Sequence, residues 1–297
     1  MRVISLLPAA TEIVAALDQA EALVGISHEC DYPPSIQHLP RVTSTRIQSD
    51  WSSRSIDRGV RLLGQNGQPV IAIDEDQVRR LAPDFILTQD LCQVCAVGGG
   101  QVHRLASVLD PAPRVLSLTA TDLAGIWQDI IRIGAALGVN ANAQALVQGL
   151  RTRLRSLTEA RSANPPRVVC IEWLEPLYLA GHWVPDLVAS AGGIDVGAEP
   201  GSQSRRAEWS ELTGLEPTCV VVMLCGFGLE RSREELELLA QPEALELMGR
   251  VPTWVLDGNA YTSRPGPRVV EGAARLQSAF RGSPLPDIAH WQPAGVC

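Results

Sequence analysis

The chain has 297 residues, of which 45% are hydrophobic and 20% charged, with a formal net charge of -8 and a pI near 5.2. This length accommodates two domains of ordinary size, and the acidic charge argues against a nucleic-acid partner or an anionic membrane surface. All 25 basic residues are arginine, which excludes a Schiff-base lysine and a P-loop lysine.

The opening of the chain predicts a cytoplasmic location. Residues 3–7 follow Met1 and Arg2 directly, and Pro8 and Glu12 interrupt any apolar run that could serve as an export signal. No stretch approaches the roughly 20 apolar residues that cross a bilayer, so we expect no membrane insertion. In a reducing compartment, the seven cysteines are expected as ligands, catalytic thiols or packed hydrophobes rather than disulfides.

The first part of the chain alternates short apolar strands with helices. We expect strands at 3–7, 22–27, 85–88 and 115–118, a strand or turn at 70–73, and helices at 11–17, 77–81 and 102–108. The polar stretch 41–67 is interpreted as a loop that carries a helix near 56–63. This alternation predicts a parallel sheet flanked by helices.

A helical tract and a second alternation follow. Helical spacing predicts one helix over 122–137 and a second, charged one from Asn140 or Asn142 to about Ala163, where Pro165 and Pro166 stop it. Beyond it we expect strands at 168–173, 177–180, 220–224 and 254–256, and helices at 184–191, 233–247 and 269–280. The Pro-rich tail 283–297 is expected to be loosely held.

The predicted fold class is therefore α/β, with two Rossmann-like lobes whose parallel sheets are joined by one long connector helix. A ligand cleft is expected between the lobes. The predicted boundaries are 1–120 for the N-terminal lobe, 121–165 for the helical connector, 166–282 for the C-terminal lobe and 283–297 for the tail.

Four cysteines follow predicted strands: Cys30, Cys92, Cys95 and Cys225. Ligands of open α/β sheets bind outside the carboxyl ends of the strands, and the CxxC spacing is that of half a zinc or iron-sulfur site. We therefore predict a metal-binding thiol cluster, which His28 could complete if Cys225 does not reach the other three. The alternative is a set of small buried hydrophobes, as we expect for Cys170 and Cys219.

Further candidates for ligand binding lie in loops beside predicted strand ends: His28, Glu29, Glu172, Trp173, His182, Trp183, Tyr261 and Arg264. For His182 and Trp183, capping and packing is an equal alternative. The loop 258–267, which contains Tyr261 and Arg264, could hold an anion or an amide, or it could simply start the last helix. No Ser-His-Asp order, HExxH motif or carboxylate pair stands out, so an enzyme is the less favoured expectation.

Five segments together resemble one family, the solute-binding proteins of cobalamin and siderophore ABC transporters. They are residues 2–12 (RVISLLPAATE), 23–34 with GIS and DYPP, 83–87 (PDFIL), 191–193 (AGG) and 263–268 (SRPGPR), in the family's order. The resemblance is greatest to the cytosolic branch of cobalamin-binding proteins. It implies two lobes, a rigid connecting helix, little hinge motion, and a corrinoid (cobalamin) as ligand. Two departures are Glu29, where relatives place an aromatic residue, and the CxxC pair.

The leading hypothesis is a cytosolic, non-catalytic protein that holds a metal-containing small molecule in the interlobe cleft. Trp173, Trp183 and Tyr261 would form apolar walls, Arg264 a polar anchor, and His28 or Cys30 would approach the metal. The alternatives are a metalloprotein that binds zinc or an iron-sulfur cluster through its thiols, with redox or enzymatic work, and an exported subunit of an ABC uptake system whose start was misread. A permease partner is doubtful under the leading hypothesis.

Overall fold

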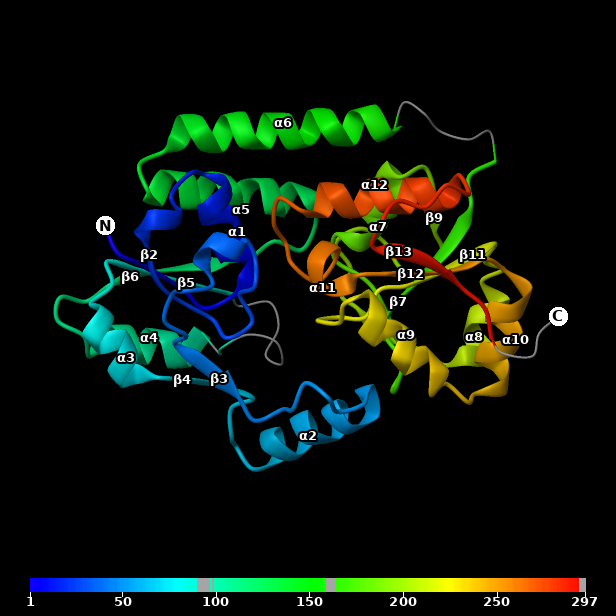
Figure 1. The fold of residues 1–297 in the computed structure, drawn as a ribbon, viewed down its shortest axis with the longest axis horizontal. Helices are drawn as coiled ribbons and strands as arrows, with labels where there is room; N and C mark the ends of the chain where they lie inside the picture. The colour runs from blue at the N-terminus through cyan, green and yellow to red at the C-terminus, as the bar shows by residue number, and fades with distance from the viewer. Residues whose placement is uncertain (90–96, 98, 159–163, 294–297) are drawn as a thin grey trace. The chain divides into compact units, whose positions relative to one another are not determined.

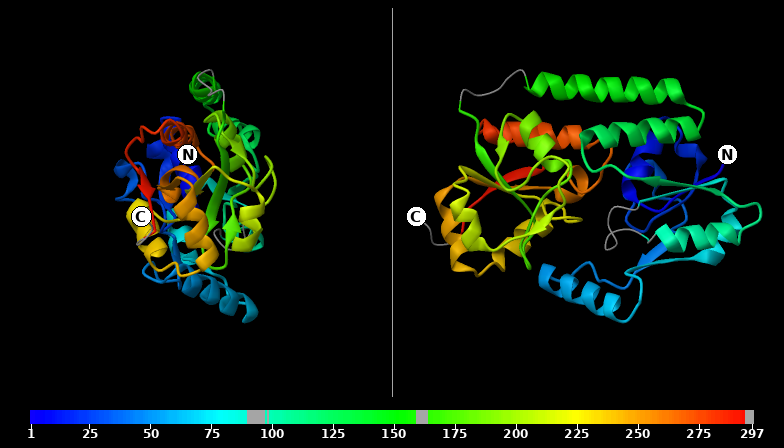
Figure 2. Two further views of the ribbon diagram at one scale, coloured as in Figure 1. Left: turned by 90° about the vertical axis from the view of Figure 1, so that its right-hand side faces the viewer. Right: turned by 180° about the vertical axis from the view of Figure 1, so that it is seen from behind.

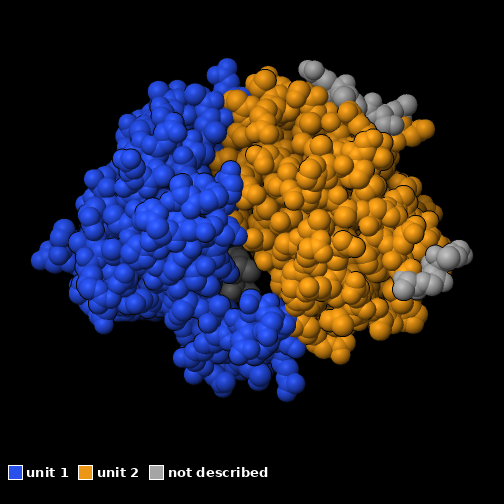
Figure 3. All heavy atoms as spheres, in the orientation of Figure 1, with its two compact units in different colours: residues 1–51, 55–120, 124–148 blue, residues 52–54, 121–123, 149–297 orange. Residues whose placement is uncertain are grey.

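The computed structural model describes residues 1–89, 97, 99–158 and 164–293, and Figures 1 and 2 show its elements from three directions. The chain forms two compact units, coloured separately in Figure 3. Unit 1 comprises residues 1–51, 55–120 and 124–148, and unit 2 comprises 52–54, 121–123 and 149–297. Separate sheets in two α/β units confirm the predicted two-lobed α/β fold.

Unit 1 is built on a four-stranded sheet in the order β2-β1-β5-β6, with every neighbouring pair parallel. The strands are β1 (Val3–Ser5), β2 (Leu23–Ile26), β5 (Phe85–Gln89) and β6 (Arg114–Leu118). The helices are α1 (Pro8–Ala16), α3 (Glu75–Leu81), α4 (Gly99–Ser107) and most of α5 (Leu123–Ala136), with short 3-10 turns η1 (Ala20–Ala22) and η2 (Pro34–Ile36). The predicted parallel sheet is therefore confirmed in unit 1.

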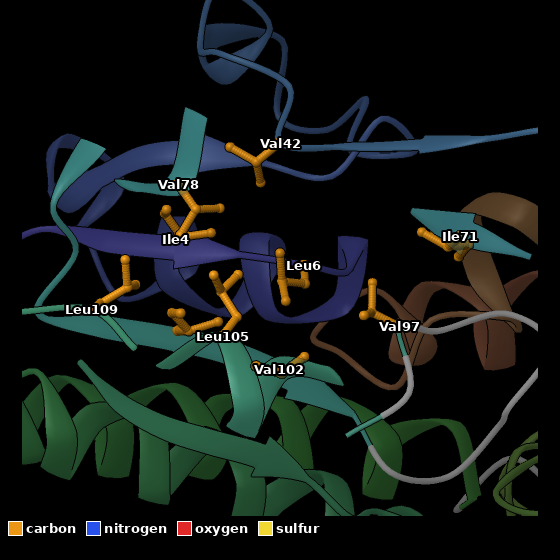
Figure 4. Packing of buried hydrophobic residues seen from close by; sticks show 10 residues of the cluster. Ile4, Leu6, Val42, Ile71, Val78, Val97, Val102, Leu105 and Leu109 are labelled. Carbon is orange, nitrogen blue, oxygen red and sulfur yellow. The ribbon is translucent and has the colours of Figure 1, made fainter. Parts of the chain in front are cut away.

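The core of unit 1 lies between this sheet and its helices. Figure 4 shows Ile4 of β1 and Leu6 packed with Val102 and Leu105 of α4 and Val78 of α3. Each of these side chains is at most 3% exposed. Burial of this apolar surface holds the strands in fixed positions. The loops that follow the strands therefore begin at rigidly held residues.

The polar stretch after β2 is more structured than the sequence suggested. The expected helix is confirmed and extended as α2 (Ser53–Gln65). Before and after it, β3 (Thr43–Thr45) and β4 (Ile71–Ile73) pair antiparallel in a separate two-stranded sheet. A helix in a polar stretch was visible from the sequence, but β3 is three residues long and its partner lies about 28 positions away, which is beyond the reach of periodicity.

The helical tract consists of α5 and α6 (Asn140–Thr158), separated at Gly138, which has a φ of +74°. This positive φ is the usual end of a helix at glycine and agrees with the predicted break. The boundary between the two units falls inside α6, after residue 148. The structure therefore divides this tract between the units, where the sequence suggested a separate helical connector.

Unit 2 carries a larger sheet in the order β10-β8-β7-β11-β12-β13, with β9 paired to β7. The strands are β7 (Arg167–Trp173), β8 (Tyr178–Leu179), β9 (Ile194–Asp195), β10 (Arg205–Arg206), β11 (Cys219–Val222), β12 (Thr253–Leu256) and β13 (Ile288–Trp291). Strands β7, β9, β11 and β12 are parallel, whereas β8 and β13 run antiparallel to their neighbours. The parallel strands expected in the second lobe are therefore present, and antiparallel strands whose direction the sequence did not indicate extend the sheet on both sides.

The helices of unit 2 are α7 (Val184–Ser190), α8 (Trp209–Gly214), α9 (Leu229–Glu237), α10 (Pro242–Arg250), α11 (Gly258–Tyr261) and α12 (Val269–Phe280). Helices α7 and α12 lie side by side (Figure 2). The single helix expected over 233–247 is two helices, because Pro242 lacks an N–H and cannot continue α9. Proline is instead favoured in the first turn, where it begins α10.

The tail corrects another expectation. Residues 288–291 are not loosely held: they form β13, which pairs with β12 through four register positions from Thr253↔Trp291 to Leu256↔Ile288. The ring of His290 packs edge-on against Trp254 with centroids 5.1 Å apart. Within the described part of the chain, every helix is too short or too polar to cross a lipid bilayer.

Candidate ligand-binding edges

In unit 1, the loop after β2 brings polar side chains to the carboxyl edge of the sheet. Val42 N–H donates to Ile26 O at 2.9 Å, and Ile26 N–H donates to Pro40 O at 3.0 Å. These bonds place the start of β3 directly beside the end of β2. Thr43 therefore lies against Ser27 and His28, which are 15 or more positions away in the sequence.

Thr43 organises this loop through its hydroxyl group. Its Oγ1 accepts the backbone N–H of His28 at 3.0 Å, donates to Ser27 Oγ at 3.1 Å and lies 2.7 Å from Nδ1 of His28. The other ring nitrogen, Nε2, is 4.0 Å from Oε1 of Glu29, beyond hydrogen-bond distance. Burial lowers the pKa of His28, and the nearby charge of Arg41 lowers it further, so the ring is neutral near pH 7.

Cys30 is a buried residue in this structure. It is 1% exposed, and its Sγ lies 3.1 Å from Oγ1 of Thr11 on α1. The Arg41 guanidinium donates to the backbone oxygens of Ser27 and Cys30 and holds the loop closed over the thiol. This environment is that of the small packed hydrophobe that was the alternative to a metal ligand.

The described residues lend no support to a thiol cluster. Cys92 and Cys95 lie outside the described residues, and Cys225 follows β11 in unit 2, where it is half-buried. Among the residues that the structure describes, no three His, Cys, Asp or Glu side chains gather so that they could hold a metal ion. Cys170 and Cys219 are confirmed as core residues, and burial raises the pKa of the Cys219 thiol to about 12.

In unit 2, the parallel strands β7, β11 and β12 end at one edge of the sheet. The ring of Trp173, at the end of β7, lies 5.4 Å from that of Phe227, which follows β11, at an interplanar angle of 54°. Trp173 Nε1–H donates to Glu175 O at 3.2 Å, which fixes the ring. Glu172 and Trp173 are half-buried, as expected for residues at a strand end. Phe227 was not predicted, although its place three residues beyond a predicted strand could have indicated it.

The loop before α12 is joined to this edge. Asp257 caps α11 by accepting the Ala260 N–H at 2.8 Å, and the N–H of Gly226 donates to Ser263 Oγ at 3.2 Å. Arg264 is 5% exposed and donates from its guanidinium to Asn259 Oδ1 at 2.8 Å. A cation is therefore held in a fixed orientation beside the ends of β11 and β12, as a polar anchor requires.

Tyr261 and Trp183 are packed into the body of unit 2. Tyr261 is 5% exposed, its hydroxyl donates to Asp287 Oδ2 at 2.9 Å, and the Arg275 guanidinium lies 3.9 Å from its ring centroid. Trp183 is 6% exposed, and its Nε1–H donates to Thr262 O at 2.8 Å. These contacts favour packing roles; the expected roles of the two residues as ligand walls stay predictions.

His182 lies after β8, not after a strand that is parallel to β7. Because β8 runs antiparallel to β7, its end points away from the edge at which β7, β11 and β12 end. His182 has a φ of +54°, and its Nδ1 lies 3.4 Å from Ser204 Oγ. Burial lowers the pKa of its ring. Residues 177–180 were recognised as a strand, but the sequence did not reveal its direction.

Known proteins share this architecture over the whole chain. The sequence pattern of the periplasmic binding protein family matches residues 3–247. The cobalamin-binding protein of Halobacterium salinarum is 24% identical, over 96% of this chain and 70% of that protein. The structure of a periplasmic heme binding protein from Pseudomonas aeruginosa covers 98% of both chains, with a TM-score of 0.72 and 22% identity.

A second solved structure, the periplasmic vitamin B12 binding protein of Vibrio cholerae, covers 95% of this chain and 97% of its own, with a TM-score of 0.65 and 19% identity. At these identities the solved structures establish the fold alone. The sequence pattern extends over most of the chain, from β1 into α10, and includes the ends of β2, β7 and β11. The chain therefore belongs to the periplasmic binding protein family.

Proposed function

We propose that this protein is a solute-binding protein whose ligand is a metal-containing tetrapyrrole, either a corrinoid or a haem. The observation that carries the proposal is the likeness over nearly the whole chain to proteins that are named for binding cobalamin and heme. Ligand identity is a property of the site rather than of the fold, so the proposal also has to agree with the residues at the strand ends.

The residues at the unit 2 edge are suited to such a ligand. A macrocycle needs an apolar surface against its flat face and a small number of fixed polar groups at its rim. Half-buried Trp173 and buried Phe227 supply an aromatic pair, and Arg264, oriented by Asn259, supplies a fixed cation that can meet an acidic or amide substituent. The expected position of the ligand, between the two lobes, stays a prediction.

The alternative hypotheses differ in how they now stand. A zinc or iron-sulfur protein would require clustered thiolates, and the buried, hydrogen-bonded Cys30 does not favour that role. The expected cytoplasmic location and the doubtful permease partner stay predictions, as does the absence of enzymatic activity.

Titration of the purified protein with aquacobalamin and, separately, with ferric haem tests the proposal. We expect saturable binding of at least one of them in the micromolar range or tighter, followed by visible absorption. Trp173→Ala should weaken binding by roughly five- to thirtyfold, which corresponds to the ~1–2 kcal/mol expected for lost aromatic contact.

A matched control is Trp291→Ala. Trp291 is also a half-buried tryptophan of unit 2, but it pairs with Thr253 at the amino end of β12, the opposite edge of the same sheet. Equal losses in the two variants would show that the effect is one of stability. If the folded wild-type protein binds neither compound, the proposed function is wrong.

A further inference from the structure

The hydrogen bonds around Thr43 determine which nitrogen of His28 carries the proton. A threonine hydroxyl has one proton to donate and two lone pairs to accept with. The Thr43 proton goes to Ser27 Oγ, and one lone pair accepts the His28 backbone N–H. With the Thr43 proton directed to Ser27 Oγ, the remaining contact, at 2.7 Å from Nδ1, is assigned as a donation from Nδ1–H to the second lone pair.

The opposite nitrogen is then an unprotonated lone-pair donor. Nε2 of His28 is buried, and among the described residues it has no hydrogen-bond partner. Its neighbour Glu29 presents a carboxylate oxygen at 4.0 Å, which has no proton to offer when ionised. Buried polar atoms are nearly always paired, so an orphan of this kind calls for a ligand that can accept its lone pair.

We propose that His28 Nε2 coordinates the metal of the bound tetrapyrrole, with Thr43 and Ser27 as the hydrogen-bonded groups that set the ring. This inference rests on the proposed function and adds to it the atom that contacts the metal. Ligating histidines commonly donate their second N–H to a nearby oxygen, which fixes the tautomer and orients the ring. Ser27, Thr43 and His28 have this arrangement.

Cys30, the other residue expected near the metal, fits this role less well. Its Sγ is engaged with Thr11 Oγ1 on α1, and its side chain is 1% exposed. His28 is 21% exposed and follows β2 at the carboxyl edge of the sheet, where ligands of such folds bind. Coordination at Nε2 requires the half-exposed Glu29 side chain beside it to turn away.

The test compares wild-type protein, His28→Ala and His28→Gln for spectra and affinity with ferric haem and aquacobalamin. Coordination by one imidazole nitrogen replaces a metal-bound water and changes the visible absorption and electron paramagnetic resonance spectra of ferric haem in a way that free imidazole reproduces. We expect this signature in the wild type, its loss in both variants, and affinity that falls at least roughly tenfold. Added imidazole should restore the wild-type spectrum of His28→Ala, which a folding defect would not allow.

Two controls complete the experiment. His38→Ala removes an exposed histidine of the same unit and should leave spectrum and affinity unchanged. Thr43→Val removes the acceptor for Nδ1–H and should weaken binding while coordination persists. A wild-type spectrum in His28→Ala, or a wild-type complex without nitrogen coordination, would overturn this inference and leave the proposed function standing. Absence of all binding by the wild type would overturn both.

Discussion

At the scale of single residues, the clearest energetic anomaly is Asp195 in β9. Its carboxylate accepts N–H groups from Gly197 at 2.8 Å and Ala198 at 3.1 Å, and Cys170 lies against it. Burial raises its pKa to about 6, because these donors do not fully replace the lost water. Between about pH 4 and 6, the folded protein therefore holds a proton on Asp195, whereas the unfolded chain, with an ordinary pKa, has released it.

This difference predicts a pH dependence of stability. As pH rises from about 4 to 6, the free energy of unfolding should fall, because the unfolded state then binds fewer protons than the folded one. The effect is at most about 3 kcal/mol for a shift of this size. Urea denaturation from pH 4 to 8 should show Asp195→Asn gaining stability relative to wild type across this window. Asp50→Asn, at an exposed position, should track the wild type, and a constant difference between wild type and Asp195→Asn would contradict the assignment.

At the scale of elements, the structure of the unit 2 edge depends on how closely the segments that follow β11 and β12 approach each other. Gly258 begins α11 directly after β12, and a Cβ built there would lie 2.3 Å from Leu224 O and 2.7 Å from the Met223 carbonyl carbon. Both are backbone atoms of the segment that follows β11. This contact brings Asn259 and Arg264 beside the end of β11, so only glycine allows the edge to close.

Gly258→Ala should therefore destabilise unit 2 by about 1–3 kcal/mol or more, since the clash is with backbone that cannot rotate away. It should also weaken ligand binding, by moving the Arg264 anchor. Gly64→Ala is the control: no atom lies within 4 Å of its added Cβ, and it sits inside helix α2. That variant should be neutral or up to about 1 kcal/mol more stable. Thermal denaturation of both variants measures the difference in their stability. Equal melting temperatures for the two variants would contradict the prediction.

The elements themselves show what a sequence can predict. Buried strands such as β1, β5 and β11 are continuous apolar runs, and their parallel order in unit 1 follows from helices that alternate with them. The direction of β8 and the existence of β13 depend on pairing between distant segments. The hydrophobic periodicity of the sequence carries no information about such pairing. The break at Pro242 was present in the sequence as a proline inside a predicted helix, and its effect on α9 could have been foreseen.

The candidate site divides in the same way. Residues at or just beyond strand ends, such as Trp173 and His28, were placed at their edges by chain order alone. Thr43 could not have been assigned, because the bond between Val42 and Ile26 that brings it to His28 joins segments without any local signal. Burial separated candidates that looked equivalent in the sequence, since Cys30 and Tyr261 are enclosed whereas His28 and Trp173 remain partly exposed.

At the scale of the whole molecule, the two units share one architectural principle. In each, parallel strands end at an edge where loops carry polar and aromatic groups, and the chain passes from one unit to the other within α6. A ligand that contacts only one edge would stabilise one unit, whereas a ligand that contacts both couples their stabilities. The expected interlobe position of the tetrapyrrole therefore has a consequence that can be measured for each unit separately.

Amide hydrogen exchange with and without saturating ligand tests this consequence. At a ligand concentration about 100 times Kd, binding should stabilise the folded state by about 2.7 kcal/mol. If the ligand touches both edges, exchange should slow both in the loop after β2, around Ser27 and His28, and in the loop after β11, around Gly226 and Phe227. His28→Ala should diminish protection in the first loop more than in the second, because the second retains its contacts with Trp173 and Ser263. Protection confined to one unit would show that the ligand is bound by that unit alone, and the interlobe prediction would then be wrong.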